Sequence, residues 1–216
     1  MMVEILEVFG NDLTVVNAAR VSFAKESHEM TLGDEKLIRY LAKHNHVTPF
    51  FHPQIRFRIK MPIFVAREWY RHQIGFARNE VSRRYVDSVP ECWVPLQMRA
   101  RDTNLKQGSK DEEVPNSEYL HKIVGNHMEG CVSLYQHLLE SNVAPEIARC
   151  VLPQSMFTEF IETGSLSAYA RLYKLRTDPT AQREIQEYAS EVGSMIEKFF
   201  PVCWKALTEE SSSAST

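Results

Sequence analysis

Glycine-rich motifs for phosphate binding are missing from this sequence. Its 216 residues include eight glycines. None stands in the G-x-G-x-x-G pattern of dinucleotide-binding folds or in the G-x-x-x-x-G-K pattern of the P-loop. A phosphate group bound by this chain would therefore have to be held by side chains. Arginine suits that role, because its guanidinium is always charged and can donate two parallel hydrogen bonds to phosphate oxygens.

Cysteine pairs, a signal sequence and long hydrophobic runs are also lacking. The four cysteines, Cys92, Cys131, Cys150 and Cys203, form no C-x-x-C pair, which favours reduced, structural thiols. The N-terminus has acidic residues and no basic segment, so it does not resemble a signal peptide. No uncharged stretch approaches the roughly 18 residues that a membrane span needs. We therefore expect a cytoplasmic protein that does not associate with membranes.

Positive charge is concentrated in one segment of an acidic chain. The formal net charge is -3, yet residues 56–84 hold eight basic and two acidic residues. A local basic segment of this kind is typical of a site for an anionic small molecule, and a nucleic-acid-binding patch would look the same. Composition alone leaves both interpretations open.

The hydrophobic pattern predicts an α+β fold with an antiparallel or mixed sheet and several long helices. Strands are expected at 3–9, 54–60 and 156–161, the second with one apolar and one positive face. Helices are expected from Asn11 to Arg20, from Thr31 to about 44, and at 62–72, 117–140, 145–153, 166–176 and 181–200. The apolar stripe of 117–140 predicts a core-facing helix that packs either within the subunit or between subunits.

We expect a single catalytic domain over residues 1–210. Residues 99–116 are poor in apolar side chains and are predicted to form an exposed loop, and the Ser- and Thr-rich residues 211–216 are predicted to form a flexible tail.

A polar cluster follows the helix expected at 62–72. Residues 71–85 read RHQIGFARNEVSRRY. Cations near a helix C-terminus compensate its dipole, but this effect is confined to the last turn. The cluster extends about a dozen residues further, so a site that holds an anion and hydrogen-bonds a heterocycle explains it better.

This segment resembles the signature of the flavin-dependent thymidylate synthase family, an Arg-His-Arg followed by seven residues and Ser. Further segments resemble family blocks in family order, namely 17–23, 44–50, 62–67, 80–85, 148–153 and 175–176. The resemblance implies a homotetramer with active sites at subunit interfaces. Each site would bind FAD and dUMP, with methylenetetrahydrofolate as carbon donor, NADPH as reductant and dTMP as product.

Site residues are carried over from the family position by position. For dUMP they are Glu68, Trp69, Tyr70, Arg71, Glu80, Val81, Ser82, Arg83, Arg84, Arg149 and Arg176. For FAD they are Thr48, Arg71, His72, Gln73, Glu80, Ser165, Leu166, Ser167 and Arg171, with Ser22 and His46 as further candidates.

The chemistry of three arginines agrees with these implied roles. Arg84 and Arg149 suit the dUMP phosphate, which is a dianion near neutral pH. Arg176, placed beside the uracil ring, would act catalytically by stabilising negative charge that develops there. Ser82 has no general base near it in sequence, and a nucleophilic serine needs one. We therefore interpret Ser82 as a substrate-positioning residue.

The sequence departs from the family signature in charge and in length. Gln73 stands where the signature has its second arginine, and eight residues, 74–81, precede Ser82 instead of seven. Our hypothesis at this point is that Arg78, within the longer segment, restores the missing charge. Four further positions depart from the residues found in the family. Phe51 stands where an acidic residue is usual, Ser165 and Arg171 where asparagines are common, and Thr180 where a histidine can occur.

Alternative interpretations remain at the level of sequence. We expect no nucleic-acid partner, but two alternatives stay open: the basic segment 56–84 with its interleaved aromatic residues could bind nucleic acid, or the altered flavin contacts could mark a catalytically inactive relative. His44, His46 and His52 lie close in sequence, but no carboxylate or cysteine accompanies them. We therefore expect hydrogen-bonded loop histidines and no metal site.

Overall fold

The computed structural model describes residues 2–103 and 108–209. The chain divides into two compact units. One comprises residue 2 with 60–71 and 79–160, and the other 3–59, 72–78 and 161–209, within the described residues. We name them the α4 unit and the α6 unit after a helix in each. This division into compact units does not test the expected single catalytic domain over 1–210, which stays a prediction. The expected tail at 211–216 lies outside the described residues.

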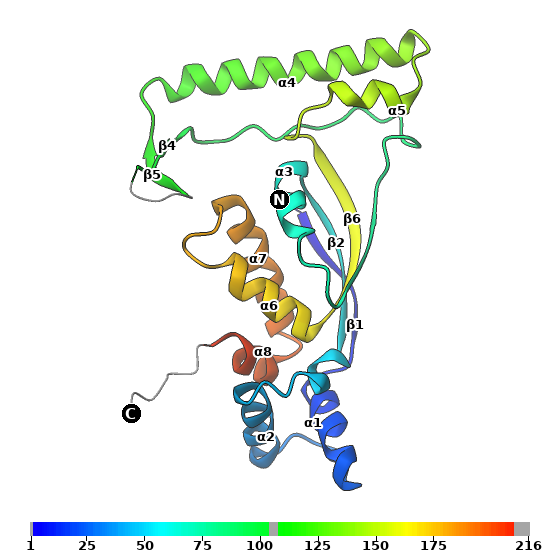
Figure 1. The fold of residues 1–216 in the computed structure, drawn as a ribbon, viewed down its shortest axis with the longest axis vertical. Helices are drawn as coiled ribbons and strands as arrows, with labels where there is room; N and C mark the ends of the chain where they lie inside the picture. Colours follow the sequence, from blue (N-terminus) through cyan, green and yellow to red (C-terminus); the bar gives the residue numbers. More distant parts are fainter. Residues whose placement is uncertain (1, 104–107, 210–216) are drawn as a thin grey trace. The chain divides into compact units, whose positions relative to one another are not determined.

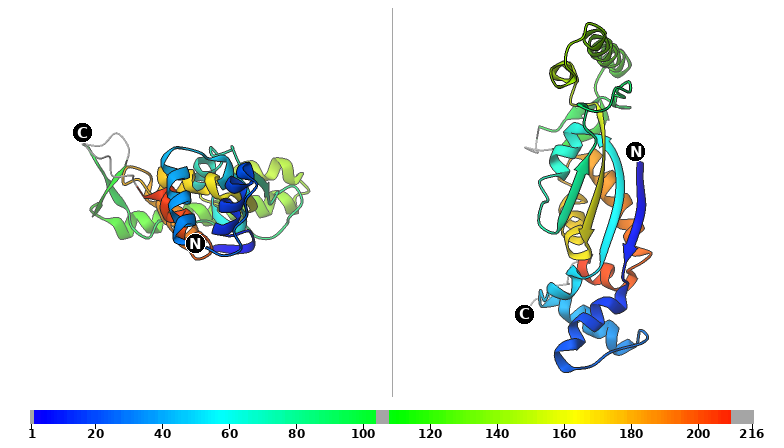
Figure 2. Two further views of the ribbon diagram at one scale, coloured as in Figure 1. Left: turned by 90° about the horizontal axis from the view of Figure 1, so that it is seen from below. Right: turned by 90° about the vertical axis from the view of Figure 1, so that its right-hand side faces the viewer.

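A four-stranded sheet has the strand order β1-β2-β6-β3. Its strands are β1 (Met2–Phe9), β2 (Gln54–Pro62), β6 (Phe157–Ser165) and β3 (Phe76–Glu80), and β1 is an edge strand (Figure 2). The three strands expected from sequence are confirmed, with β6 reaching four residues beyond 161. Strand β3 was not predicted, because its sequence FARNE is mostly polar and largely exposed.

The α6 unit contains five α-helices, α1 (Asp12–Arg20), α2 (Leu32–Lys43), α6 (Leu166–Arg176), α7 (Arg183–Glu197) and α8 (Pro201–Thr208), with short 3-10 turns at Val21–Phe23 and Thr48–Phe51. Capping boxes begin α1 and α2: Asn11 pairs with Thr14 in the first, and Thr31 with Asp34 in the second. Helix α8 was missed because the sequence prediction continued α7 to residue 200. Pro201 was taken as an end, although proline also fits the first turn of a helix.

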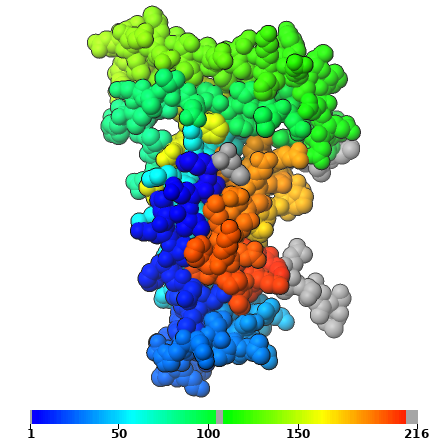
Figure 3. Space-filling model, turned by 180° about the vertical axis from the view of Figure 1, so that it is seen from behind, coloured from blue at the N-terminus to red at the C-terminus, as the bar shows by residue number. Residues whose placement is uncertain are grey.

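Aromatic packing joins sheet and helix within the α6 unit. The ring of Tyr169, on α6, meets Phe57 at 5.3 Å and Phe76 at 4.9 Å between centroids, both edge to face. A Cβ at Gly164 would lie 2.5 Å from the Phe76 ring, so only glycine admits this contact. Helices α6, α7 and α8 pack against one another (Figure 1). Helix α8 also packs against α2, and the two form one continuous surface (Figure 3).

The α4 unit contains α3 (Ile63–Trp69), α4 (Ser117–Glu140), α5 (Pro145–Ala148) and a 3-10 turn, η3 (Arg149–Val151). Helix α4 has the predicted bounds and packs on α5 and η3 (Figure 1). Packing of its stripe within the subunit is contradicted, because Tyr135 is its only buried residue; packing between subunits stays a prediction. Helix α3 ends at Trp69, three residues earlier than predicted.

The segment predicted as an exposed loop at 99–116 contains two short strands. Strands β4 (Arg99–Arg101) and β5 (Ser109–Glu113) pair antiparallel, with Arg99 opposite Glu113. All five residues of β5 are exposed, so no apolar alternation signalled the strand. Residues 104–107 of the predicted loop lie outside the described residues. None of the helices in the described part of the chain combines the length and apolar character of a membrane span.

Candidate functional site

A tight turn brings the segment after α3 onto the start of α6. Gly75 has φ +85°, and the amide of Phe76 donates to the carbonyl of Gln73 at 3.2 Å. The amide of Ser165 donates to the Gly75 carbonyl at 3.1 Å, and a Cβ at Gly75 would lie 2.9 Å from the Cβ of Ala168. Glycine is therefore required here for both backbone conformation and close approach. Residues 72–75 are fixed against the helix that carries the predicted flavin residues Leu166, Ser167 and Arg171.

His72 and Arg176 form a side-chain pair in this region. The guanidinium Nε of Arg176 donates to Nε2 of His72 at 2.9 Å, and His72 is only 8% exposed. Because a guanidinium can only donate, Nε2 of His72 is an acceptor and carries no proton. The structure thus brings together two predicted site residues that are 104 positions apart in sequence and fixes the orientation of the Arg176 side chain.

The remaining predicted flavin residues of the α6 unit differ in exposure. Thr48, Gln73 and Arg171 are exposed, whereas Ser165 and Leu166 are buried. The Ser165 hydroxyl caps α6 by accepting from the amide of Ala168 at 3.2 Å. Exposed polar side chains with one cation suit an anionic, hydrogen-bonding ligand. Ser165 and Leu166 shape the start of the helix, while Ser167 is half-buried. The further candidates Ser22 and His46 are exposed.

Arg78 does not fit the role hypothesised for it. Its Nε donates to the carboxylate of Glu162, whose side chain is fully buried, and the guanidinium also lies 4.7 Å from the centroid of the Phe76 ring. Arg78 is therefore neutralised by a buried carboxylate, and its charge is not available to an external phosphate. The same carboxylate lies near Tyr169, and burial, reinforced by Glu162, raises the pKa of Tyr169 well above its ordinary value.

Sequence reasoning missed Glu162, although the sequence held a signal for it. In β6, Thr158, Phe160 and Glu162 alternate with residues on the other face, and all three are buried. An acidic residue on the apolar face of a strand requires a cation or hydrogen-bond donor as partner. Arg78 provides it. Carrying the alternation of 156–161 one residue further would have placed a carboxylate in the interior.

In the α4 unit, Trp69 and Tyr70 serve packing. Trp69 is completely buried, and the ring of Tyr70 meets that of Phe160 edge to face at 5.0 Å. Glu68 is half-buried and Arg71 is exposed. Of these four predicted dUMP residues, Arg71 therefore presents the most accessible polar group.

The segment around Ser82 is held by hydrogen bonds. Glu80 accepts from the Thr158 hydroxyl at 2.5 Å, and the amide of Val81 donates to the Glu159 carbonyl at 2.9 Å. The Ser82 hydroxyl oxygen accepts from the amide of Arg84 at 3.3 Å. Among the described residues Ser82 has no hydrogen bond to a histidine or carboxylate. This contact pattern fits a positioning residue.

Three arginines of the α4 unit complete the predicted dUMP set. Arg83 donates to the carbonyl of Ser88. Arg84 faces Glu146 at 3.4 Å, in a pair whose two side chains are 50% and 56% exposed. Such an exposed pair is worth little and can open readily. Arg149, in η3, is exposed. Arg84 and Arg149 therefore keep cationic groups accessible to an anion.

The basic face of β2 is accompanied by carboxylates. Arg56 pairs with Glu7 at 2.8 Å and Arg58 with Glu4 at 3.5 Å. Lys60 pairs with Glu91 at 2.7 Å. These pairs reduce the positive potential of this strand, on which the nucleic-acid interpretation was based.

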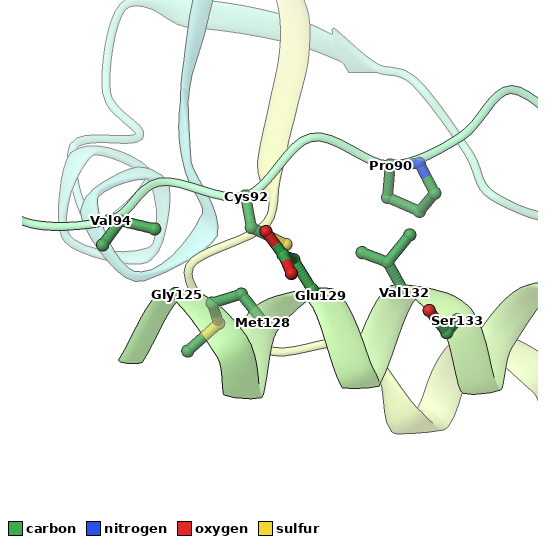
Figure 4. Close-up of a pocket in the computed structure, with 8 residues that line it drawn as sticks. All are labelled: Pro90, Cys92, Val94, Gly125, Met128, Glu129, Val132 and Ser133. Atoms are coloured by element: carbon green, nitrogen blue, oxygen red, sulfur yellow. The ribbon is translucent and has the colours of Figure 1, made fainter. Parts of the chain in front are cut away.

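Other features of the described residues do not coincide with the predicted site. A cavity of about 470 Å³ in the α4 unit lies between residues 90–94 and α4, lined by Pro90, Cys92, Val94, Gly125, Met128, Glu129, Val132 and Ser133 (Figure 4). None of these is a predicted site residue. Within the described residues, no cluster of three His, Cys, Asp or Glu side chains could hold a metal ion.

Comparison with known proteins identifies the class. Residues 4–202 match the model of a family described as thymidylate synthase complementing protein, and the chain belongs to this family. Its relatives include flavin-dependent thymidylate synthases. That of Thermosipho melanesiensis is 38% identical over 91% of this chain and 86% of its own. That of Kosmotoga olearia is 39% identical over 94% and 88%.

A solved structure supports the same placement. The UMP/dUMP methylase PolB from Streptomyces cacaoi, bound with 5-Br dUMP, superposes with a TM-score of 0.84 at 32% identity and covers 96% of this chain and 94% of that one. The expected α+β fold and the family resemblance are therefore confirmed. The roles of individual site residues stay predictions.

Proposed function

We propose that this protein is a flavin-dependent thymidylate synthase that converts dUMP to dTMP. Methylenetetrahydrofolate would supply the carbon unit, and NADPH-reduced FAD the hydride. The observation that carries the proposal is the packing of residues 72–75 against α6. Two arginines of α6 contact this segment: Arg176 donates to His72, and the exposed Arg171 donates to the Ile74 carbonyl. Family membership over residues 4–202 supports it.

The residues of the chain bind and orient the reactants in this proposal. Arg84 and Arg149 bind the phosphate of dUMP, and Arg84 leaves its weak pair with Glu146 to do so. Arg176 acts as the catalytic residue, because its guanidinium, held by His72, stabilises negative charge on the uracil ring. Ser82 and Glu80 position the nucleotide. The chemistry that bound FAD supplies is hydride transfer, which belongs to the cofactor.

The exposed residues Thr48, Gln73 and Arg171 fit the flavin nucleotide, since they combine hydroxyl, amide and cationic groups on one unit. We further propose that the active enzyme is a cytoplasmic homotetramer with its sites at subunit interfaces. The exposed apolar residues of α4, among them Ile123 and Leu134, support an assembly that covers them.

Omission of single components tests the function. The protein is purified, freed of any bound flavin and incubated with dUMP, methylenetetrahydrofolate, NADPH and FAD, and dTMP is measured with each component left out in turn. We expect product only with the complete mixture. Product formed without FAD would overturn the assignment, and a colourless protein without dTMP formation would favour the inactive relative. Polynucleotide binding that weakens steeply with salt, in a protein without bound flavin, would favour the nucleic-acid alternative.

UMP methylation is a second candidate, because PolB is a UMP/dUMP methylase and superposes over almost the whole chain. The same assay with equal concentrations of UMP and dUMP separates the two. We expect the methylated product of dUMP to predominate, and predominant methylation of UMP would transfer the assignment to the second candidate.

A further inference from the structure

The cavity of about 470 Å³ in the α4 unit, here called the α4 cavity, has walls of two kinds. Its eight lining residues are those drawn in Figure 4, and none belongs to the sets predicted for dUMP or FAD. Six of them are buried or half-buried: Pro90, Cys92, Val94, Gly125, Met128 and Val132. Glu129 and Ser133 are exposed. The inner wall is therefore mostly apolar, and the polar groups lie on the side that water reaches.

The Cys92 thiol belongs to the uncharged wall. Burial raises the pKa of Cys92 above its ordinary value, and the neighbouring Cys131 adds to this effect, so the thiol stays protonated at neutral pH. The Arg83 guanidinium acts in the opposite direction, but it does not line the cavity and donates to the Ser88 carbonyl. Among the eight lining residues, all of which the structure describes, Glu129 alone therefore carries a charge.

The charge of Glu129 is not compensated by the described residues. Neither an ion pair nor a hydrogen bond joins its side chain to any of them. The side chain rises from α4 toward the segment that carries Cys92 (Figure 4). The Ser133 hydroxyl, one helical turn further along α4, likewise has no hydrogen bond to a described residue. A carboxylate and a hydroxyl next to an apolar wall favour a ligand that combines an apolar body with a cationic donor.

Gly125 exposes the backbone of α4 inside the cavity. In a helix interior only proline is less favourable than glycine. A Cβ at Gly125 would nevertheless meet no described atom within 4 Å beyond the backbone of α4 itself, so packing within the described chain does not require glycine. The same holds for Gly130, which does not line the cavity. A flat group that packs on the backbone at Gly125 would use the space that a side chain would otherwise fill.

We propose that the α4 cavity binds a small organic cation, in which a protonated amine is attached to a flat apolar group. The apolar group packs between Val94 and the exposed backbone at Gly125. The amine lies at the open side, where it donates to the Glu129 carboxylate and the Ser133 hydroxyl. The volume of about 470 Å³ is within the range of small-molecule sites in proteins.

This site is separate from the surface of α4 that is assigned above to assembly. The exposed apolar residues Ile123 and Leu134 do not line the cavity. The inference also does not depend on the proposed thymidylate synthase activity, since it uses none of the residues predicted to bind dUMP or FAD.

Tryptamine and tryptophol test the proposal with one ring system and two charges. Tryptamine carries a protonated amine where tryptophol has a neutral hydroxyl. Each is titrated into full-length protein with 13C-labelled methionine methyl groups, and the NMR signal of Met128, assigned through Met128→Leu, reports on the cavity. We expect this signal to shift with tryptamine, with a Kd of roughly 0.1 to 1 mM for a ligand of this size. Tryptophol should bind about fivefold more weakly, because it lacks the exposed ion pair.

Substitutions on α4 locate the bound amine. Gly125→Leu fills the cavity and should weaken tryptamine binding by at least about tenfold, whereas Gly130→Leu, the matched control, should leave it unchanged. Both variants replace glycine by a better helix former at a place where a Cβ meets no neighbour, so both should fold. Glu129→Gln should abolish the difference between the two ligands. Glu140→Gln, at the end of the same helix, should preserve it.

Four results would each overturn the inference. If excess tryptamine leaves the Met128 signal unchanged, the cavity does not take such a cation. Equal affinity of Gly125→Leu and the original protein for tryptamine would place the binding elsewhere. Equal affinity of the original protein for tryptamine and tryptophol would remove the role of Glu129. Finally, absence of binding together with dissociation of the assembly by Gly125→Leu, but not by Gly130→Leu, would show that a second subunit fills the cavity.

Discussion

Helices α7 and α4 carry similar apolar stripes but bury them differently. In α7, Ile185, Tyr188, Val192 and Ile196 are at most 5% exposed. In α4, Ile123 and Leu134 are 45% and 46% exposed, although the spacing is that of a core-facing helix. The comparison shows that helical periodicity indicates a surface that will be covered, but does not identify what covers it.

The physical difference lies in the neighbours of each helix. Helix α7 packs against α6 and α8 inside the α6 unit, and Gly193 lets the rings of Tyr173 and Trp204 approach closely. Helix α4 has short neighbours, α5 and η3. Charged pairs follow the same division, because Arg78–Glu162 is buried in the α6 unit and Arg84–Glu146 is exposed in the α4 unit.

The two charged pairs give the largest expected contrast. Glu162→Gln leaves the Arg78 guanidinium without its counter-charge in the interior and should lower the free energy of unfolding by about 3 to 4 kcal/mol. Glu146→Gln, in the exposed pair, should cost less than about 1 kcal/mol. Urea unfolding at constant protein concentration measures both. Equal losses would mean that burial does not distinguish the two pairs.

The apolar stripes give the next contrast. Ile196→Ala removes a fully buried side chain of α7 and should destabilise the fold by about 3 kcal/mol through lost burial and a cavity. Ile123→Ala in α4 should change the stability of the dissociated chain by less than about 1 kcal/mol. Thermal unfolding at low protein concentration compares the two. A loss for Ile123→Ala as large as that for Ile196→Ala would place the α4 stripe in a core after all.

Secondary structure was predictable where one face of an element is buried within this chain. The alternation of Ile55, Phe57 and Ile59 predicted β2, and all three are completely buried. Strand β3 escaped prediction because its sequence is mostly polar and exposed, and because the strand it pairs with, β6, lies far along the chain. Helix α8 escaped because Pro201 fits either the end of one helix or the first turn of the next.

The candidate site was predictable as a set of residues but not as a set of contacts. Sequence placed Arg71, His72 and Gln73 in one motif, yet it assigned the compensating charge to Arg78, an arginine within the longer signature segment. The buried carboxylate that neutralises Arg78 comes from β6. The contact of Arg171 with Ile74 spans 97 positions. Pairings at such distances depend on how strands and helices pack, and a single sequence does not record them.

Assembly provides a third way to test the comparison. If a second subunit covers the α4 stripe, Ile123→Asp should weaken association by at least about tenfold, because a charge would have to be buried in an apolar contact. Sedimentation across a range of concentrations would show dissociation of the predicted homotetramer. Glu118→Gln, at the start of the same helix, is the control and should not dissociate it. An unchanged assembly for Ile123→Asp would show that this stripe stays uncovered.

The smallest expected effect concerns Asp34, a buried carboxylate in the capping box that begins α2. Helix α4 begins without a side-chain cap. Burial alone would raise the pKa of Asp34, but hydrogen bonds from Thr31, Arg20 and Ser27 outweigh it and lower the pKa. A carboxyl whose pKa is depressed on folding contributes stability above its unfolded value of about 4, and this contribution is lost as pH falls through the folded pKa. Asp34→Asn should therefore be less stable at neutral pH and should lose less additional stability below pH about 4. Parallel acid-unfolding curves for the two proteins would contradict this account, because the charge of Asp34 would then contribute nothing to the start of α2.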